Sequence, residues 1–318
     1  MRRVIFLLVL ILCGAGLCGA AQPLTLPSGT ETILNHIYSG QSNLAISEAQ
    51  QLQQQLPEHP LGYILEAEAL WWKIWCSSAE FKYGMSMPRH REKLAADQHY
   101  LDLAAKALAT AEAKLKEQES AEMHFYAGMA EALTSRLYGL RWEYHNTARV
   151  GVRARENFTR ALELDPGLAD ADMGLGLYDY YVDTLSTMAR VLRFFMGIPG
   201  GSKEEGIKLL QRSMREGQLT PVVSRFCLAM NLHNYDQRFQ EALVVLTPLA
   251  EKYPDNPIFL LAQGDLLGKL GRKSQAIEAY RAAKVAGNRL SDPAMKQKID
   301  VLVQESLTAL ENPPPGKQ

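Results

Sequence analysis

The side chains that could do chemistry are scattered along this sequence and do not gather into a known motif. The chain has seven histidines, and none forms the two-histidine, one-glutamate helical motif of a zinc-dependent hydrolase. The sequence has no CxxC pair, phosphate-binding glycine loop or GxSxG nucleophile turn. Carboxylate pairs such as Asp170/Asp172 and Asp179/Asp183 lack an evident nucleophile or acid–base partner. We therefore expect a non-catalytic protein without metal or cofactor.

Two cysteines, Cys76 and Cys227, lie beyond the N-terminal segment. Both have apolar neighbours, in "WKIWCSS" and "SRFCLAM". Two distant cysteines in such settings do not make a disulfide framework. We expect two buried thiols, which pack as small apolar side chains.

An unusual aromatic cluster, "WWKIW", occupies residues 71–75. At helical spacing Trp71 and Trp75 share one face, whereas Trp72 points elsewhere. Two interpretations stay open, namely core packing of a long helix and the apolar wall of a ligand pocket.

The elements that must position these residues follow a repeat. Ala242, Leu246, Leu249 and Pro254 lie at offsets 0, 4, 7 and 12, and the same offsets recur from Ala154 and from Ala45. Offsets 0, 4 and 7 place three side chains on one helical face, and the proline ends the helix. Each unit is therefore predicted to be a helix–turn–helix whose small residue lets two helices cross closely. Such units bury their apolar faces only by stacking.

The period and pattern resemble the tetratricopeptide repeat (TPR) family. The most complete unit is "NPIFLLAQGDLLGKLGRKSQAIEAYRAAKVAG", and Ala242 and Ala276 are 34 residues apart. The family's marks in this unit are Leu260, Gly264, Leu267, Gly271, Ala276, Tyr280 and Ala283. The resemblance covers about residues 26–290 and implies an all-α solenoid of antiparallel helix pairs.

The middle units are longer than the family's period. We assign Ala104, Ala154 and Gly206 as their small residues, and the last two are 52 residues apart. A continuous apolar stripe also predicts one long helix from Ala121 to about His145. The middle of the array is therefore expected to contain lengthened helices and an insertion.

The resemblance also implies a binding surface, because TPR arrays bind partners in a concave groove lined by the first helix of each unit. A polar and aromatic groove of this kind suits protein recognition. The positions that match are Arg136, Glu143, Tyr180, Tyr181, Asn231, Asn234, Tyr235, Asp265 and Lys269.

Residues 184–199 form the predicted insertion, an amphipathic helix that "GIPGG" ends. Arg190 and Arg193 fall opposite the apolar stripe, and Phe194 lands on the polar side near Arg190. The insertion is interpreted as a helix packed on the array, as the lid or wall of a groove or pocket together with Trp71 and Trp75, or as a membrane-surface helix. Ser202 and Glu205 then predict a capping box for the next helix.

The N-terminus has the pattern of a secretory signal, with Arg2 and Arg3, an apolar run and small residues up to Ala21. Cleavage is expected after Ala20 or Ala21, which makes the protein periplasmic or secreted. The alternative is an uncleaved membrane anchor, since eighteen consecutive residues are apolar or small. Apart from a membrane-surface role of the insertion, only that alternative would bring the protein into contact with a membrane.

The predicted organisation has five parts. These are a signal (1–20), a linker (21–25), a TPR-like array (26–290), a C-terminal capping helix (291–311) and a proline-rich disordered tail (312–318). A net charge of −1 offers no basic field for nucleic acid. Two functions remain open, namely a scaffold that binds a protein or peptide in the cell envelope, and a binder of a small apolar ligand similar to TPR components associated with solute transporters.

Overall fold

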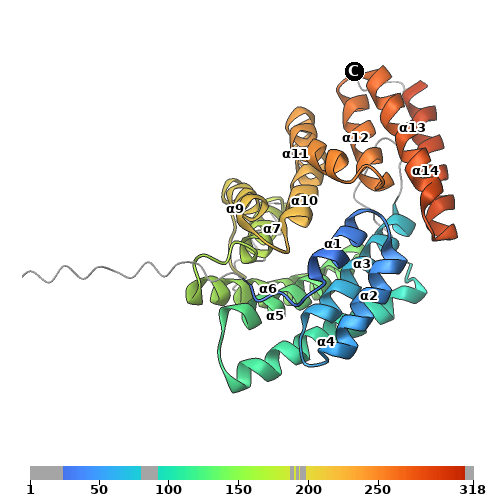
Figure 1. Ribbon diagram of the computed structural model, residues 1–318. Coiled ribbons are helices and arrows are strands. Elements are labelled where there is room, and N and C mark those ends of the chain that lie inside the picture. The colour runs from blue at the N-terminus through green and yellow to red at the C-terminus, as the bar shows by residue number, and fades with distance from the viewer. Residues whose placement is uncertain (1–23, 80–91, 187–189, 191–192, 194–197, 312–318) are drawn as a thin grey trace, which may run out of the picture.

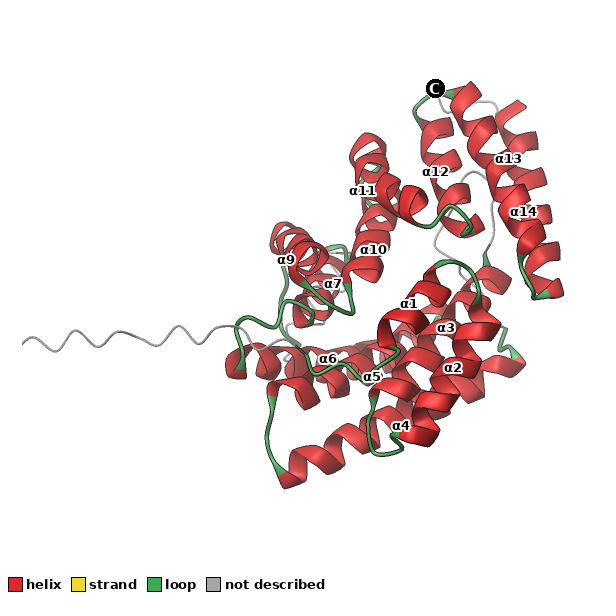
Figure 2. Cartoon of the chain, viewed as in Figure 1, coloured by secondary structure: helices red, strands yellow, loops and turns green. Residues whose placement is uncertain are grey.

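The computed structural model describes residues 24–79, 92–186, 190, 193 and 198–311, and these contain helices but no strand (Figure 2). The helices are α1 (Thr30–Tyr38), α2 (Ser42–Gln55), α3 (Leu61–Ser78), α4 (Ala95–Glu117), α5 (Ala121–Leu140), α6 (Tyr144–Leu164), α7 (Ala171–Asp183), α9 (Lys203–Glu216), α10 (Pro221–Asn234), α11 (Phe239–Lys252), α12 (Pro257–Lys269), α13 (Lys273–Arg289) and α14 (Pro293–Glu311).

Consecutive helices pack as pairs, and the pairs stack along the chain (Figure 1). The pairs are α1/α2, α3/α4, α5/α6, α7/α9, α10/α11 and α12/α13, with α14 packed on α13. The small residue predicted for each unit is buried in the second helix of its pair. These residues are Ala45, Ala104, Ala154, Gly206, Ala242 and Ala276. The predicted all-α, TPR-like array of helix pairs is confirmed.

A close helix crossing occurs in the unit with the insertion. A Cβ atom added to Gly206 would lie 2.6 Å from the backbone oxygen of Gly176, and one added to Gly176 would lie 2.8 Å from that of Gly206. Helices α7 and α9 therefore touch through their backbones, which only glycine allows at these two positions. Ser202 caps α9 by accepting a hydrogen bond from the Glu205 backbone, as the capping box predicts.

The single helix predicted from Ala121 to about His145 is wrong. Helix α5 ends at Leu140, and α6 begins at Tyr144 after a tight turn. Trp142 has a φ of 65°, and the Glu143 N–H donates to the Tyr138 carbonyl across the turn. This left-handed ending satisfies the last carbonyls of α5 and reverses the chain.

Several predicted segments lie outside the described residues, namely the signal, most of the insertion helix and the tail at 312–318. Helix α14 covers most of the range expected for the capping helix. None of the helices in the described part of the chain has the length and apolar run of a membrane-spanning segment.

Aromatic packing joins the first units of the array to the last. The ring centre of Trp72 on α3 lies 5.1 Å from the ring centre of Phe226 on α10 and 5.6 Å from that of Phe259 on α12. Trp75 also contacts Phe226, and Tyr38 at the end of α1 contacts Trp72. Edge-to-face aromatic contacts of this kind add to the area that they bury.

Polar contacts reinforce the same closure. The Asn256 side chain donates to the Tyr38 carbonyl over 2.8 Å, and Lys73 pairs with Asp292 at the start of α14 over 2.7 Å. Figure 1 accordingly shows the blue first helices next to the orange and red last helices. An ordinary solenoid keeps its ends apart, because each repeat contacts only its neighbours. This array instead closes on itself.

We predict that Trp72→Ala lowers the free energy of unfolding by about 3–5 kcal/mol, the usual cost of truncating a fully packed tryptophan. Urea denaturation followed by circular dichroism measures the change. Tyr144→Ala is the matched control, because the Tyr144 side chain is 65% exposed. Equal stability of the Trp72 variant and the control would show that the closure adds nothing.

Asp172 predicts a pH dependence of stability. Its side chain is buried in α7, one carboxylate oxygen lies 2.9 Å from Arg212, and the other has no hydrogen-bond partner. Burial raises the pKa of this carboxyl from 3.8 to about 6, against the opposing charge of Arg212. The raised pKa stabilises the fold fully below pH 3.8, and this contribution is lost as the pH rises through about 6.

Asp172→Asn removes the cost of the ionised carboxylate, so the variant is expected to gain about 1–2 kcal/mol over the natural protein at pH 8. The gain should vanish near pH 4. Thermal melts across this pH range test it, and a gain that does not change with pH would exclude titration of Asp172 as its cause.

Candidate functional site

Four helices face one another inside the closed array, namely α3, α5, α7 and α10. Each is the first helix of its pair; α5 contacts α3 and α7, and α7 contacts α10. The contact between Trp72 and Phe226 completes the ring from α10 back to α3. Side chains of these helices, with one each from α1 and α4, form a group that we call the inner polar cluster. Its members are Tyr38, Glu68, Tyr100, Arg136, Tyr181, Cys227 and Asn231.

An ion pair lies at the centre of this cluster. The Arg136 guanidinium donates to Glu68 over 2.6 Å and to the Tyr100 hydroxyl over 3.1 and 3.3 Å. It also lies 4.2 Å from the ring centre of Trp71, a cation–π contact. Glu68 is buried, whereas the Arg136 side chain keeps 23% of its surface exposed. The pair is therefore held in position while the arginine remains accessible.

Buried polar atoms without hydrogen bonds mark the same region. Glu68 Oε1 has no hydrogen-bond partner, and neither amide atom of Asn231 meets hydrogen-bond geometry although that residue is fully buried. The Tyr181 side chain is half-buried, and its hydroxyl is close enough to the Asn231 amide for a hydrogen bond of imperfect geometry. Buried polar groups are nearly always paired, whereas Arg136 and Tyr181 are the polar side chains of this region that keep exposed surface.

The cluster is electrostatically coupled. Burial raises the pKa of Cys227 to about 12, a rise that the Arg136 charge opposes and the Glu68 charge increases. Burial, with the Glu68 charge adding to it, also holds the pKa of Tyr38 well above its usual value. Both side chains therefore stay protonated at neutral pH.

The predicted groove residues separate into two groups. Arg136, Tyr181 and Asn231 meet in the inner polar cluster. Tyr180 is instead buried beside it, where its hydroxyl donates to Asp236 over 2.6 Å and its ring contacts the rings of Tyr181 and Tyr235.

The remaining groove residues lie in turns or pair locally. Asp265 is buried, 2.8 Å from His233, and Asn234 donates to the Met230 carbonyl at the end of α10. Glu143 lies in the turn before α6, and Lys269 is exposed at the last residue of α12.

The proposed pocket residues do not form one wall. Trp75 packs in the closure, and Arg136 covers Trp71. Arg190 is exposed and donates to the Leu185 carbonyl, and Arg193 donates to the Ile198 carbonyl. Phe194 lies outside the described residues.

Sequence reasoning missed Glu68, Tyr38 and Tyr100. Glu68 lies in the apolar run "YILEAEALWW", and a carboxylate inside an otherwise buried stripe was the available signal. Tyr100 comes from α4, the second helix of its pair, which is not expected to line a concave face, and Tyr38 is the last residue of α1.

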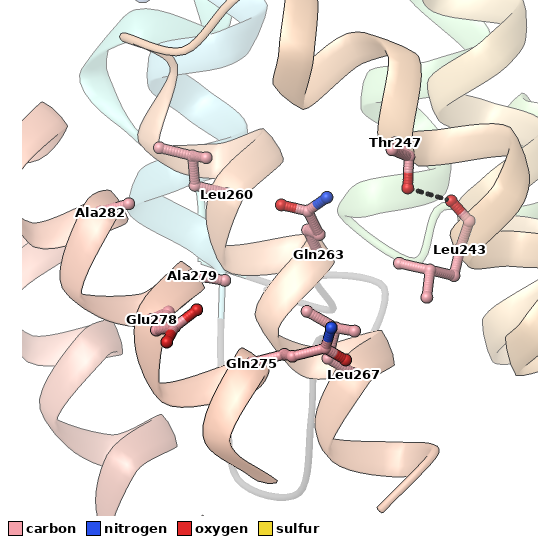
Figure 3. A pocket seen from close by; sticks show the side chains of 9 residues that line it. All are labelled: Leu243, Thr247, Leu260, Gln263, Leu267, Gln275, Glu278, Ala279 and Ala282. Carbon is pink, nitrogen blue, oxygen red and sulfur yellow. Dashed lines mark hydrogen bonds between the residues drawn. The ribbon is translucent and has the colours of Figure 1, made fainter. Parts of the chain in front are cut away.

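A shallower hollow of about 380 Å³ lies away from this cluster, over α12 between α11 and α13 (Figure 3). Its apolar floor includes Leu243, Leu260 and Leu267, and Gln263 and Gln275 extend along it. In the described part of the chain, no three His, Cys, Asp or Glu side chains gather as metal ligands would.

Comparisons with known proteins add little to this description. No protein-family model matches the sequence, and no curated protein matches it. Among solved structures, the C-terminal part of a TPR repeat-containing protein from Cytophaga hutchinsonii is similar, with 14% identity, a TM-score of 0.35, and coverage of 90% of this chain and 96% of that one. Yeast Tom70 is similar with 10% identity, a TM-score of 0.38, and coverage of 88% and 73%.

The raised pKa of Cys227 predicts slow alkylation at pH 8. A thiol with a pKa of about 12 holds about a thousandfold less thiolate there than an ordinary cysteine. Iodoacetamide labelling followed by peptide mass spectrometry should show slow reaction in the folded chain and fast reaction in urea. Labelling of the folded chain at the rate of free cysteine would contradict the electrostatics of the cluster.

Proposed function

We propose that this protein is an exported, non-catalytic scaffold that binds an extended segment of a partner protein at the inner polar cluster. The observation that carries the proposal is the partly exposed Arg136 guanidinium, which Glu68 and Tyr100 hold in position. A peptide carbonyl can accept a hydrogen bond from such a guanidinium. The half-buried Tyr181 ring and the Arg136 guanidinium supply the contact area typical of recognition surfaces.

The alternative ligand, a small apolar molecule, fits this site less well. It would bury an ion pair and an amide without returning their hydrogen bonds, which is costly. The ring face of Trp71 is covered by Arg136, and Trp75 is used in the closure. The polar character of the cluster therefore favours a partner with its own hydrogen-bonding groups.

Export is the second part of the proposal, and it is supported by the signal-like pattern of residues 1–21. A protein exported in this way would meet its partner in the cell envelope or outside the cell. Mass spectrometry of the N-terminal peptide from a fractionated host culture locates the protein and shows whether the signal is removed.

In-cell photo-crosslinking tests the binding site. A benzoylphenylalanine in place of Tyr181 should give a discrete adduct with a partner, whereas the same residue in place of Tyr144, exposed on α6, should not. Adding Arg136→Lys keeps a positive charge beside Glu68 but removes the guanidinium fork, and it should reduce the Tyr181 adduct about tenfold, the effect of losing one or two hydrogen bonds.

Two outcomes would contradict the proposal. Equal adducts at positions 181 and 144 would mean that contact is unspecific. Absence of any adduct at 181, with the folded protein present at its normal level, would mean that the inner polar cluster does not contact a protein.

A further inference from the structure

Two partly buried arginines near the insertion have no acidic partner. Arg155 on α6 and Arg193 are both partly buried, and neither forms an ion pair with a carboxylate of the described residues. Arg136, Arg141 and Arg212, which are also buried or partly buried, each pair with a carboxylate. A charge that is partly removed from water without a counter-charge is unfavourable, so these two arginines call for an explanation.

Tyr178 on α7 brings the two arginines together. The Arg155 guanidinium carbon lies 5.4 Å from the centre of the Tyr178 ring, a cation–π contact. The Tyr178 hydroxyl donates to the Pro199 carbonyl over 2.9 Å, and the Arg193 guanidinium donates to the preceding carbonyl, that of Ile198, over 3.2 Å. Both guanidinium groups are therefore held beside one tyrosine side chain.

The charges of both arginines reach the Tyr178 hydroxyl. Burial raises the pKa of Tyr178, the charges of Arg155 and Arg193 oppose that rise, and those of Asp179 and Glu156 add to it. Burial also raises the pKa of Asp179, against the charge of Arg155. Neither Asp179 nor Glu156 forms an ion pair with these arginines among the residues that the structure describes. The two positive charges are thus close together, and no ion pair cancels them.

The ends of the two guanidinium groups are accessible. The Nε atom of each arginine is buried, whereas both side chains keep exposed surface. Within the described ranges, the Arg155 side chain donates no hydrogen bond, and that of Arg193 donates only the one to Ile198. The terminal nitrogens of Arg155 and Nη2 of Arg193 are therefore available donors. Such N–H groups match the spacing of carboxylate and phosphate oxygens.

We infer that Arg155 and Arg193 bind a phosphate group at the junction of α6, α7 and residues 198–200. Two guanidinium charges match the charge of about −2 that a phosphate monoester carries at neutral pH, whereas a carboxylate would neutralise only one of them. Tyr178, which is fixed by its bond to Pro199, keeps Arg155 in position. This site shares no residue with the inner polar cluster and adds a second binding activity to the proposed one.

Isothermal titration calorimetry with the purified protein and sodium phosphate tests this inference. At constant ionic strength, phosphate should bind with a Kd of about 1 mM, the affinity expected of two charge-assisted hydrogen bonds. Acetate should bind about tenfold more weakly, because its single charge engages one arginine. Equal affinity for phosphate and acetate, or no heat from phosphate, would overturn the inference.

The variant Arg155→Gln/Arg193→Gln should bind phosphate about tenfold more weakly, since both charged donors are lost. Arg272→Gln/Arg281→Gln is the matched control, because it removes two exposed charges at α13. An unchanged affinity of the first variant, or an equal loss in the control, would contradict the site.

Arg155→Lys/Arg193→Lys separates a loss of binding from a loss of folding. It keeps both charges but removes the guanidinium forks, so it should fold and bind phosphate with an affinity between those of the natural protein and the glutamine variant. Circular dichroism shows whether each variant is folded. A folded lysine variant without any phosphate binding would mean that the two positive charges do not form the site.

A phosphate group can belong to a small soluble molecule or to a lipid headgroup, and vesicle flotation distinguishes these sources. Vesicles of phosphatidylglycerol and phosphatidylcholine that carry the natural protein but not the glutamine variant would identify a headgroup. Binding of free phosphate without such a difference between the proteins on vesicles would identify a soluble phosphate compound. Both results support a phosphate site, and loss of both effects would exclude it.

Discussion

The packing of Trp72 against Phe226 and Phe259 is the constraint on which the rest of this structure depends. It joins helices that are more than 150 residues apart in sequence, and it turns a row of helix pairs into a ring. Trp75 on α3 contacts Phe226 as well, and without these two tryptophans α10 would lose its aromatic contacts with α3. Glu68 and Arg136 would then pair on an open, hydrated face. An ion pair in water contributes little to the stability of the fold.

The helix pairs could be predicted from the sequence, because the spacing of small and apolar residues within a unit determines how its two helices pack. A small residue recurs wherever two helices cross, so six second helices could be located from alanine and glycine alone. Closure of the ring could not be predicted in this way. It depends on a small rotation between successive pairs, summed over all pairs, and lengthened units such as α5/α6 change that sum.

The residues of the candidate site divide in the same way, into those placed by local helix packing and those placed by closure of the ring. Arg136, Tyr181 and Asn231, which were predicted as groove residues, lie on the first helices of their pairs as expected, and whether they bind a partner stays a prediction. Glu143 was misplaced because a predicted helix ran through the turn at Trp142, where the chain takes a left-handed conformation. Tyr38 joins the cluster through the ring closure alone, and no pattern within α1 signals that.

The end-to-end contacts also determine how this molecule comes apart. A linear repeat protein can lose its terminal units one at a time, since each unit touches only the next. Here Leu24 forms a hydrogen bond with Gln218, and Tyr38 forms one with Asn256, over sequence separations of 194 and 218 residues. Fraying of either end breaks contacts made by the other, so the array unfolds as one cooperative body. Long loop closures of this kind also make folding slow, and the ring is complete only after the last helix pairs have formed.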